Sequence, residues 1–177
     1  MNDLDHQLEE LLQQEVVKEL DLSRNSITRV PTKISNIKGL QKLNLEHNYL
    51  KEIPKELGKI ASLYQLDISD NEIKNLPSTL ADLSRLEWLD LSANQFEKLP
   101  ENFGDLSLLE WLDLKSNQFK TLPASFAKLR QLEKLNIEVN ELEELPENFG
   151  ELTALKWLDV SDNQLRNLPT SFAQLQQ

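Results

Sequence analysis

The sequence predicts an α/β solenoid, a stack of short coils that each contribute one strand. The first observation is a period of 23 residues, marked by an asparagine at one point of seven successive copies: Asn25, Asn48, Asn71, Asn94, Asn117, Asn140 and Asn163. The second is a proline six residues after each asparagine, at Pro31, Pro54, Pro77, Pro100, Pro123, Pro146 and Pro169. Self-similarity at a fixed period of this length is typical of repeat architectures. We therefore divide the chain into an N-terminal segment, residues 1–16, and seven repeats, residues 17–177.

The N-terminal segment is predicted to form an amphipathic helix that caps the stack. Leu4, Leu8, Leu11 and Leu12 fall at i, i+4, i+7 and i+8, a spacing that gives a helix one apolar stripe. A lone helix this short is marginal in water, so its stripe needs a surface to pack on. The first repeat supplies that surface.

Within each repeat, an apolar frame is interrupted by outward positions. In the second copy the inward residues are Leu40, Leu43, Leu45, Leu50, Ile53, Leu57 and Ile60. Residues 43–45 alternate between apolar and polar, which predicts a short strand with one buried face. The following proline cannot donate to a sheet ladder, so it begins a segment that returns along the outer side.

This pattern, Leu-x-x-Leu-x-Leu-x-x-Asn-x-Leu-x-x-Leu-Pro, resembles the leucine-rich repeat family, in particular its 23-residue Leu-Pro class. Ras-suppressor and Scribble-type scaffolds, Roco N-terminal regions and many bacterial leucine-rich repeat proteins share it. The resemblance covers residues 17–177. It implies a right-handed curved solenoid with about seven short parallel strands on the concave side and extended or 3₁₀ segments on the convex side. It also implies that the helix over 1–16 is a cap.

The last repeat ends without a polar cap, which terminal repeats normally carry. Leu175 is equivalent to Leu152 of the previous copy, so another strand would be expected to follow, and Leu168 and Phe172 would have nothing stacked beyond them. We expect either that the chain is the N-terminal portion of a longer protein or that this edge meets another chain.

Two sets of equivalent positions, here called columns, are assigned to structure. The asparagine column is expected to be buried at every turn, where each side chain bonds backbone groups that the bend leaves unpaired. Phe103, Phe126, Phe149 and Phe172 share one column and are expected to stack as a packing spine in the interior.

The tryptophans occupy one outward column and are the candidate binding residues. Trp88, Trp111 and Trp157 share it with Glu19, Lys42, Gln65 and Lys134, and Tyr64 lies one residue before it. Because neighbouring strands are about 4.8 Å apart, Trp88 and Trp111 should lie side by side. The pair would then either stabilise adjacent strands by cross-strand contact or act as an aromatic anchor for a partner.

The next outward column holds Asp67, Asp90 and Asp113, among other Asp and Asn residues, and Lys115 follows in the third. A row of carboxylates is open to interpretation as a calcium site, but calcium ligands usually converge from several directions. We expect instead a negative potential that favours a basic partner.

Composition excludes several functional classes. The net charge of −11 disfavours nucleic acid and anionic membrane surfaces, and the chain has no cysteine and two histidines. No triad, phosphate loop or dinucleotide motif is present, so we expect no enzyme activity, cofactor or metal site. The acidic first twenty residues do not resemble a secretory signal, which indicates a cytoplasmic protein or a bacterial effector secreted without a cleaved signal peptide.

Three hypotheses for function follow. The first is a protein-interaction module that binds a protein or peptide on its concave face through Trp88 and Trp111, with Trp157 and Tyr64 beside them. The second is the recognition or regulatory arm of a larger enzyme, such as a Roco-like GTPase or a ubiquitin-ligase effector. The third is self-association through the exposed C-terminal repeat.

Overall fold

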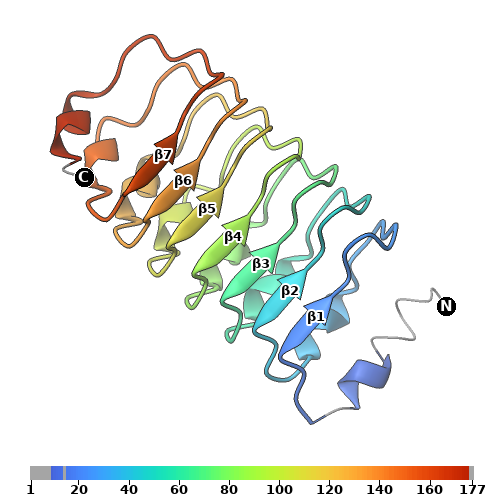
Figure 1. The fold of residues 1–177 in the computed structure, drawn as a ribbon. Helices are drawn as coiled ribbons and strands as arrows, with labels where there is room; N and C mark the ends of the chain where they lie inside the picture. The colour runs from blue at the N-terminus through green and yellow to red at the C-terminus, as the bar shows by residue number, and fades with distance from the viewer. Residues whose placement is uncertain (1–8, 14, 176–177) are drawn as a thin grey trace.

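The computed structural model describes residues 9–13 and 15–175, which form a curved stack of coils around one parallel sheet (Figure 1). Seven strands follow one another across the sheet in chain order. They are β1 (Glu19–Asp21), β2 (Lys42–Asn44), β3 (Gln65–Asp67), β4 (Trp88–Asp90), β5 (Trp111–Asp113), β6 (Lys134–Asn136) and β7 (Trp157–Asp159). The register places equivalent residues side by side, for example Leu89 beside Leu112. The 23-residue period is therefore the step from one strand to the next.

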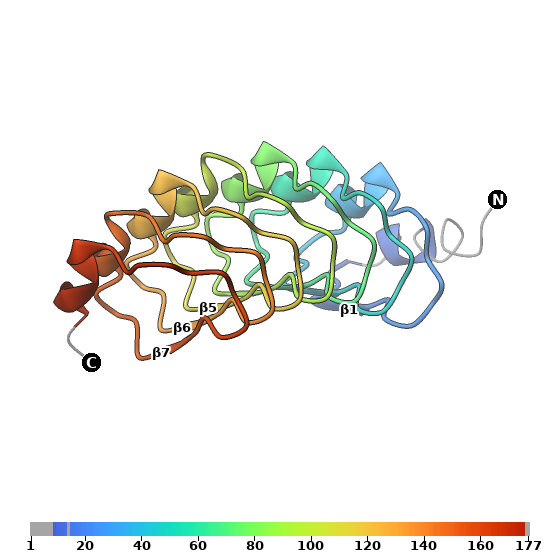
Figure 2. The same cartoon turned by 90° about the horizontal axis from the view of Figure 1, so that it is seen from above.

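Short 3₁₀ helices return the chain along the convex side, opposite the sheet (Figure 2). They are η1 (Thr32–Asn36), η2 (Lys55–Lys59), η3 (Ser78–Asp82), η4 (Phe103–Asp105), η5 (Ala124–Lys128), η6 (Phe149–Glu151) and η7 (Thr170–Gln174). Their first turn closes on the repeat proline, as where the Leu80 N–H donates to the Pro77 carbonyl over 2.9 Å. Proline suits this position because it lacks an N–H and favours the extended conformation seen there.

One continuous apolar core runs between the sheet and the 3₁₀ helices. The four phenylalanines stack as expected, with ring centroids 6.2 Å apart for Phe103–Phe126, 6.3 Å for Phe126–Phe149 and 6.2 Å for Phe149–Phe172. The first three are buried, whereas Phe172 in the last coil is only partly buried. Phe96 and Phe119 form a second stack at 6.1 Å.

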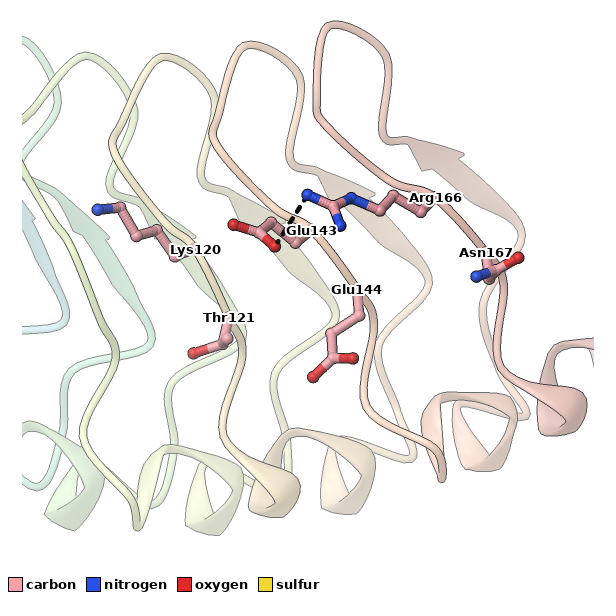
Figure 3. A pocket seen from close by; sticks show the side chains of 6 residues that line it. All are labelled: Lys120, Thr121, Glu143, Glu144, Arg166 and Asn167. Carbon is pink, nitrogen blue, oxygen red and sulfur yellow. Dashed lines mark ion pairs between the residues drawn. The ribbon is translucent and has the colours of Figure 1, made fainter.

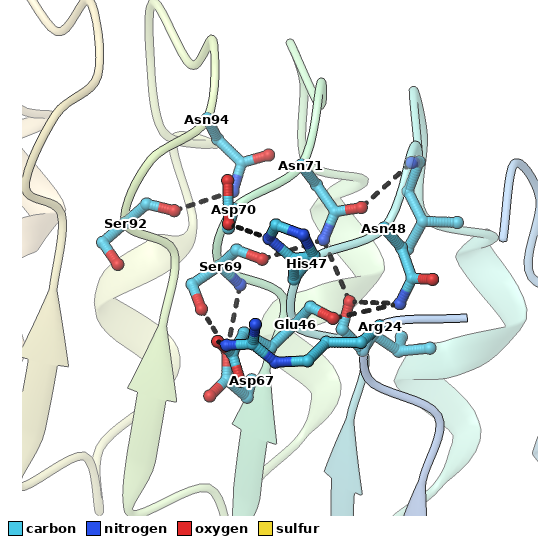
Figure 4. Close-up of polar contacts among 12 residues, drawn as sticks. Arg24, Glu46, His47, Asn48, Asp67, Ser69, Asp70, Asn71, Ser92 and Asn94 are labelled. Atoms are coloured by element: carbon cyan, nitrogen blue, oxygen red, sulfur yellow. Dashed lines mark hydrogen bonds and ion pairs between the residues drawn. The ribbon is translucent and has the colours of Figure 1, made fainter. Parts of the chain in front are cut away.

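The asparagine column bonds each coil to its neighbour (Figure 4). Asn94 Nδ2 donates to the Ile68 carbonyl of the preceding coil over 2.9 Å and to two carbonyls of its own coil. Its Oδ1 accepts the Ile73 N–H over 3.0 Å. Asn48, Asn71, Asn117 and Asn140 are buried in the same way. These side chains satisfy the backbone groups that the bend leaves unpaired.

The prediction that this asparagine column is buried at every turn was wrong for the two end residues. Asn25 is exposed, and its Nδ2 donates to the Ser23 carbonyl of its own turn. Asn163 is half-buried, although it still reaches the Ile137 carbonyl of the preceding coil. Asn25 differs because its side chain has no preceding coil of the same kind to bond.

The predicted helix over 1–16 can be compared with the structure only at residues 9–13, 15 and 16. Residues 9–12 are α-helical, and Leu11 and Leu12 pack against the core, whereas residues 1–8 and 14 lie outside the described residues. The helix does not extend to residue 16, because the Val17 N–H already donates to the Lys38 carbonyl of the first coil. Within residues 9–13 and 15–175, no helix is long and apolar enough to cross a membrane.

At the other end, the last coil is less buried than the coils before it. Leu168 is 52% exposed, whereas its equivalent Leu145 is 4% exposed. Phe172 and Leu175 are also only partly buried. The apolar side chains predicted to lack a neighbour on their far side are therefore accessible to solvent.

On the convex side, successive coils alternate between two kinds of contact. A Cβ on Gly104 would lie 1.8 Å from the Ser125 carbonyl oxygen of the next coil, and a Cβ on Gly150 equally close to that of Ser171. The intervening copy has alanine at this position, Ala127. Glycine is therefore required where η4 approaches η5 and where η6 approaches η7, a 46-residue alternation within the 23-residue repeat.

Candidate functional site

The concave face of the sheet carries the residues singled out by the sequence. Trp88 and Trp111 are paired by the register of β4 and β5, and their indole rings stack with centroids 4.4 Å apart and planes 3° from parallel. Both side chains are half-buried. The side-by-side arrangement expected from strand spacing is therefore present, and we name this pair the Trp ridge.

Carboxylates lie on both sides of the Trp ridge. Glu87 and Glu110, immediately before the two tryptophans, are exposed, and Asp90 and Asp113 occupy the other end of the same strands. An indole face is electron-rich and attracts cations, and the surrounding carboxylates add to this attraction. The centre of the concave face therefore combines a large aromatic surface with negative charge.

Trp157 lies near the ridge but does not join its stack. Lys134 of β6 stands between Trp111 and Trp157 in the register. The two indoles form opposite sides of an open groove of about 290 Å³, which Asp113, Lys134 and Asn136 also line. We name this hollow the Trp111–Trp157 groove.

Tyr64 lies just before β3, and its ring lies near a cation. Lys42 Nζ is 6.0 Å from the Tyr64 ring centroid, and the same ammonium is 2.8 Å from a carboxylate oxygen of Glu19. Tyr64 therefore takes part in a local cation–π contact at the entry to β3.

The aspartate column has a structural role that the sequence reasoning missed. Asp90 Oδ1 accepts the Ser92 N–H over 2.9 Å and the Ser92 hydroxyl over 2.6 Å. The same i+2 backbone contact is made by all seven members of the column: Asp21, Asn44, Asp67, Asp90, Asp113, Asn136 and Asp159. Asp and Asn are favoured at such turns because the short side chain can accept this bond. That preference was the signal available in the sequence.

Burial shifts the pKa values of the central carboxylates. It raises the pKa of Asp90 to about 6, against the Ser92 hydrogen bonds that lower it, and the Asp67 and Asp113 charges raise it further. Burial also raises the pKa of Asp67 and of Asp113. Coil stacking removes part of the hydration of these carboxylates, which disfavours their charged form. The negative potential at the centre therefore depends on pH.

Lys115 belongs to an internal network. Its ammonium donates to a Glu138 carboxylate oxygen, and that hydrogen bond is the main cause of a raised Lys115 pKa. Asp113 and Asp159 also act on Lys115 through their charges. Lys115 is therefore less available to a partner than its exposure in the repeat pattern suggested.

Other concavities offer weaker binding chemistry. One of them, about 430 Å³, lies beside the sheet and is lined by polar residues that include the ion pair Arg166–Glu143 at 3.6 Å (Figure 3). Near β1 to β3, His47 contacts Asp70, and both side chains are more than half exposed (Figure 4). Neither the hollow beside Arg166 nor the surface around His47 provides the water-excluded cavity that acid–base catalysis requires. Within the described part of the chain, no group of three or more His, Asp or Glu side chains has the geometry to hold a metal.

Comparisons with known proteins match this geometry. Family models match in three regions: leucine rich repeat at residues 38–96, leucine-rich repeat region at 79–142, and leucine rich repeat at 154–175. No curated protein sequence matches the chain.

Solved structures match over nearly the whole chain. A leucine-rich repeat protein of Leptospira interrogans is 27% identical, with a TM-score of 0.67, over 99% of this chain and 56% of that protein. The structure of PEPR1–AtPEP1 is 29% identical, with a TM-score of 0.80, over 92% of this chain and 24% of that chain. The Arabidopsis receptor kinase HAESA, in complex with the peptide hormone IDA and the co-receptor SERK1, is 26% identical, with a TM-score of 0.77, over 91% of this chain and 29% of that chain.

This chain thus spans about half the length of the Leptospira protein and about a quarter of the two plant chains. The repeat frame, the parallel sheet and the family models agree with one another. The chain belongs to the leucine-rich repeat family.

Proposed function

We propose that this chain is a protein-interaction module that binds an extended segment of a partner protein across its concave face. The observation that carries the proposal is the Trp ridge, two parallel indoles in contact with solvent on the central strands β4 and β5. Tryptophan is enriched among residues that dominate binding energy, because it combines a large apolar surface with few rotatable bonds. Cross-strand stabilisation accounts for about 0.2–1 kcal/mol and does not require tryptophan.

The dimensions of the sheet fit a peptide in an extended conformation. Seven parallel strands about 4.8 Å apart span about 29 Å, which about nine residues at 3.3 Å each would cross. The carboxylates around the Trp ridge favour basic residues at the middle of such a segment. The similar structure of HAESA in complex with the peptide hormone IDA supports a protein or peptide partner.

The proposal is tested with a displayed library of random peptides of about twelve residues, long enough to cross the sheet. Peptides selected on the wild type are synthesised, and their affinities are measured by fluorescence anisotropy. The double variant Trp88→Ser, Trp111→Ser should lose about 30-fold or more in affinity, the loss expected for an energetically dominant residue.

Tyr49→Ser is the matched control, because Tyr49 is an aromatic residue that is 55% exposed but lies outside the strands. It should leave the affinity unchanged. Circular dichroism confirms that each variant is folded. A folded double variant that binds the selected peptides as tightly as the wild type would refute the proposed function.

A second candidate, self-association, is supported by the accessible apolar side chains of the last coil. Leu168 is 52% exposed, and Leu165 and Phe172 are only partly buried. Sedimentation velocity at increasing concentration tests it: Leu168→Asp should abolish dimers that the wild type forms. A wild type that remains monomeric at high concentration eliminates this candidate.

A further inference from the structure

The polar groups of the concave face differ in whether an internal partner already occupies them. Asp67 and Asp90 each use Oδ1 for the turn, and neither Oδ2 accepts a hydrogen bond from a described residue. Both oxygens of Asp113 are occupied, Oδ1 by the Lys115 N–H and Oδ2 by Asn136 Nδ2. Among the aspartates beside the Trp ridge, the free carboxylate oxygens therefore lie on β3 and β4.

The cations of this face differ in the same way. Lys42 pairs with Glu19, and Lys115 pairs with Glu138 at the centre of a group that includes Asp113 and Asp159. The ammonium of Lys134, which is exposed, has no hydrogen-bond or ion-pair partner among residues 9–13 and 15–175. It is therefore available to an external anion.

The surroundings of Lys134 restrict the kind of anion. Lys134 lies in the Trp111–Trp157 groove, with an indole on each side and with Asp113 and Asn136 bonded to each other below. A carboxylate on a short side chain can meet the ammonium while apolar neighbouring groups contact the indoles. An arginine or lysine in the groove would be repelled by the Lys134 ammonium. It could not pair freely with the nearby Asp113, because both oxygens of that carboxylate already accept hydrogen bonds.

We propose that the Trp111–Trp157 groove is a subsite for an acidic side chain of the bound segment, whose basic residues lie over β3 and β4. This inference rests on the proposed function and adds to it the order of acidic and basic residues along the bound segment, here called its polarity. Lys134 on β6 is two to three strands from Asp67 and Asp90, about 10–14 Å at 4.8 Å per strand. The acidic and basic residues of the partner are therefore separated by about three to four residues of extended chain.

The same peptide library tests the inference by selection on the wild type and on Lys134→Glu and Lys134→Gln. Peptides selected on the wild type should carry Asp or Glu about three to four positions from Arg or Lys. Selection on Lys134→Glu should replace the acidic residue with a basic one, and selection on Lys134→Gln should lose the acidic preference. Peptides selected on the wild type should bind Lys134→Glu about 10-fold or more weakly.

Lys98→Glu is the matched control, because it changes the net charge equally but lies on an exposed position outside the strands. It should leave both the selected sequences and their affinities unchanged. Identical consensus sequences for the wild type and Lys134→Glu would overturn the polarity while leaving the proposed function intact, provided that the Trp double variant still loses binding. A wild type that selects no peptide would overturn the proposed function and this inference together.

Discussion

Asp90→Asn is predicted to stabilise the protein at neutral pH. Burial, together with the neighbouring carboxylates, raises the Asp90 pKa to about 6, so ionised Asp90 opposes folding. Asparagine already occupies the equivalent positions 44 and 136, where its Oδ1 accepts the same backbone N–H over 2.9 and 3.0 Å. The substitution therefore removes the buried charge and keeps the turn.

The magnitude follows from the pKa shift. A rise from 3.8 to about 6, at 1.36 kcal/mol per unit, gives a ceiling of about 3 kcal/mol at pH 7. The carboxylate is not fully buried, and the asparagine makes a weaker bond to the Ser92 hydroxyl, so we expect a gain of about 1–2 kcal/mol. For a chain of this size the midpoint of thermal unfolding should rise by about 2–8 °C.

The dependence on pH provides the sharper test. Because the folded pKa is raised, wild-type Asp90 takes up a proton in the folded state as the pH falls below about 6. The cost of its charge then disappears and is absent below the unfolded value near 3.8. Urea unfolding at pH 7.0 and 4.0 should therefore show an advantage of Asp90→Asn at the higher pH and little difference at the lower.

Asp159→Asn is the control, since the Ser161 hydroxyl and N–H lower the pKa of Asp159 and its charge is favoured in the folded state. It should not stabilise the protein at pH 7. Two results would show that burial of a charged Asp90 does not destabilise the fold. One is a loss of stability in Asp90→Asn at pH 7, and the other is a gain that is the same at both pH values.

Three further predictions, on the bonding, spacing and backbone strain of the coils, are checked by urea unfolding. Asn94→Ala should lower the free energy of unfolding by about 3 kcal/mol or more, because it leaves several buried backbone groups unpaired. The control Asn25→Ala, at an exposed position, should lower it by about 0.5 kcal/mol or less. Equal losses would contradict the bonding between coils. Gly104→Ala should cost about 2 kcal/mol or more, since its Cβ would lie 1.8 Å from a carbonyl oxygen, and a neutral effect would show that the coils separate easily. Val139→Asn should stabilise by about 1 kcal/mol, because Val139 is a β-branched residue at φ 56° and 41% exposed; destabilisation would mean that this valine contributes packing that outweighs its strain.

The sequence was sufficient for the parts of the structure that the 23-residue period determines. The period alone places Trp88 beside Trp111 and stacks Phe103 on Phe126, because a parallel sheet in chain order brings equivalent residues together. It also identified the asparagine that bonds adjacent coils, except at the ends of the stack, where a repeated pattern has no neighbour to act on.

Features that depend on the space between coils could not be read from the period. The raised pKa of Asp90 results from burial by adjacent strands, which strand spacing in water does not reveal. Lys115 and Lys134 are both cations at outward positions in the sequence, yet among the described residues Lys115 meets a carboxylate of the next coil and Lys134 does not. The alternation of Gly104 and Ala127 was visible in the sequence at twice the repeat length, and its cause became clear from the close approach of the 3₁₀ helices.

The most direct test of binding at the Trp ridge is the response of its indole N–H signals to a selected peptide. The chain has three tryptophans, so a ¹⁵N-correlated NMR spectrum should contain three indole signals, each assigned by substituting one tryptophan. Titration with a peptide selected on the wild type should shift the Trp88 and Trp111 signals in a saturable manner. Saturable binding of that peptide with all three indole signals unmoved would contradict the account.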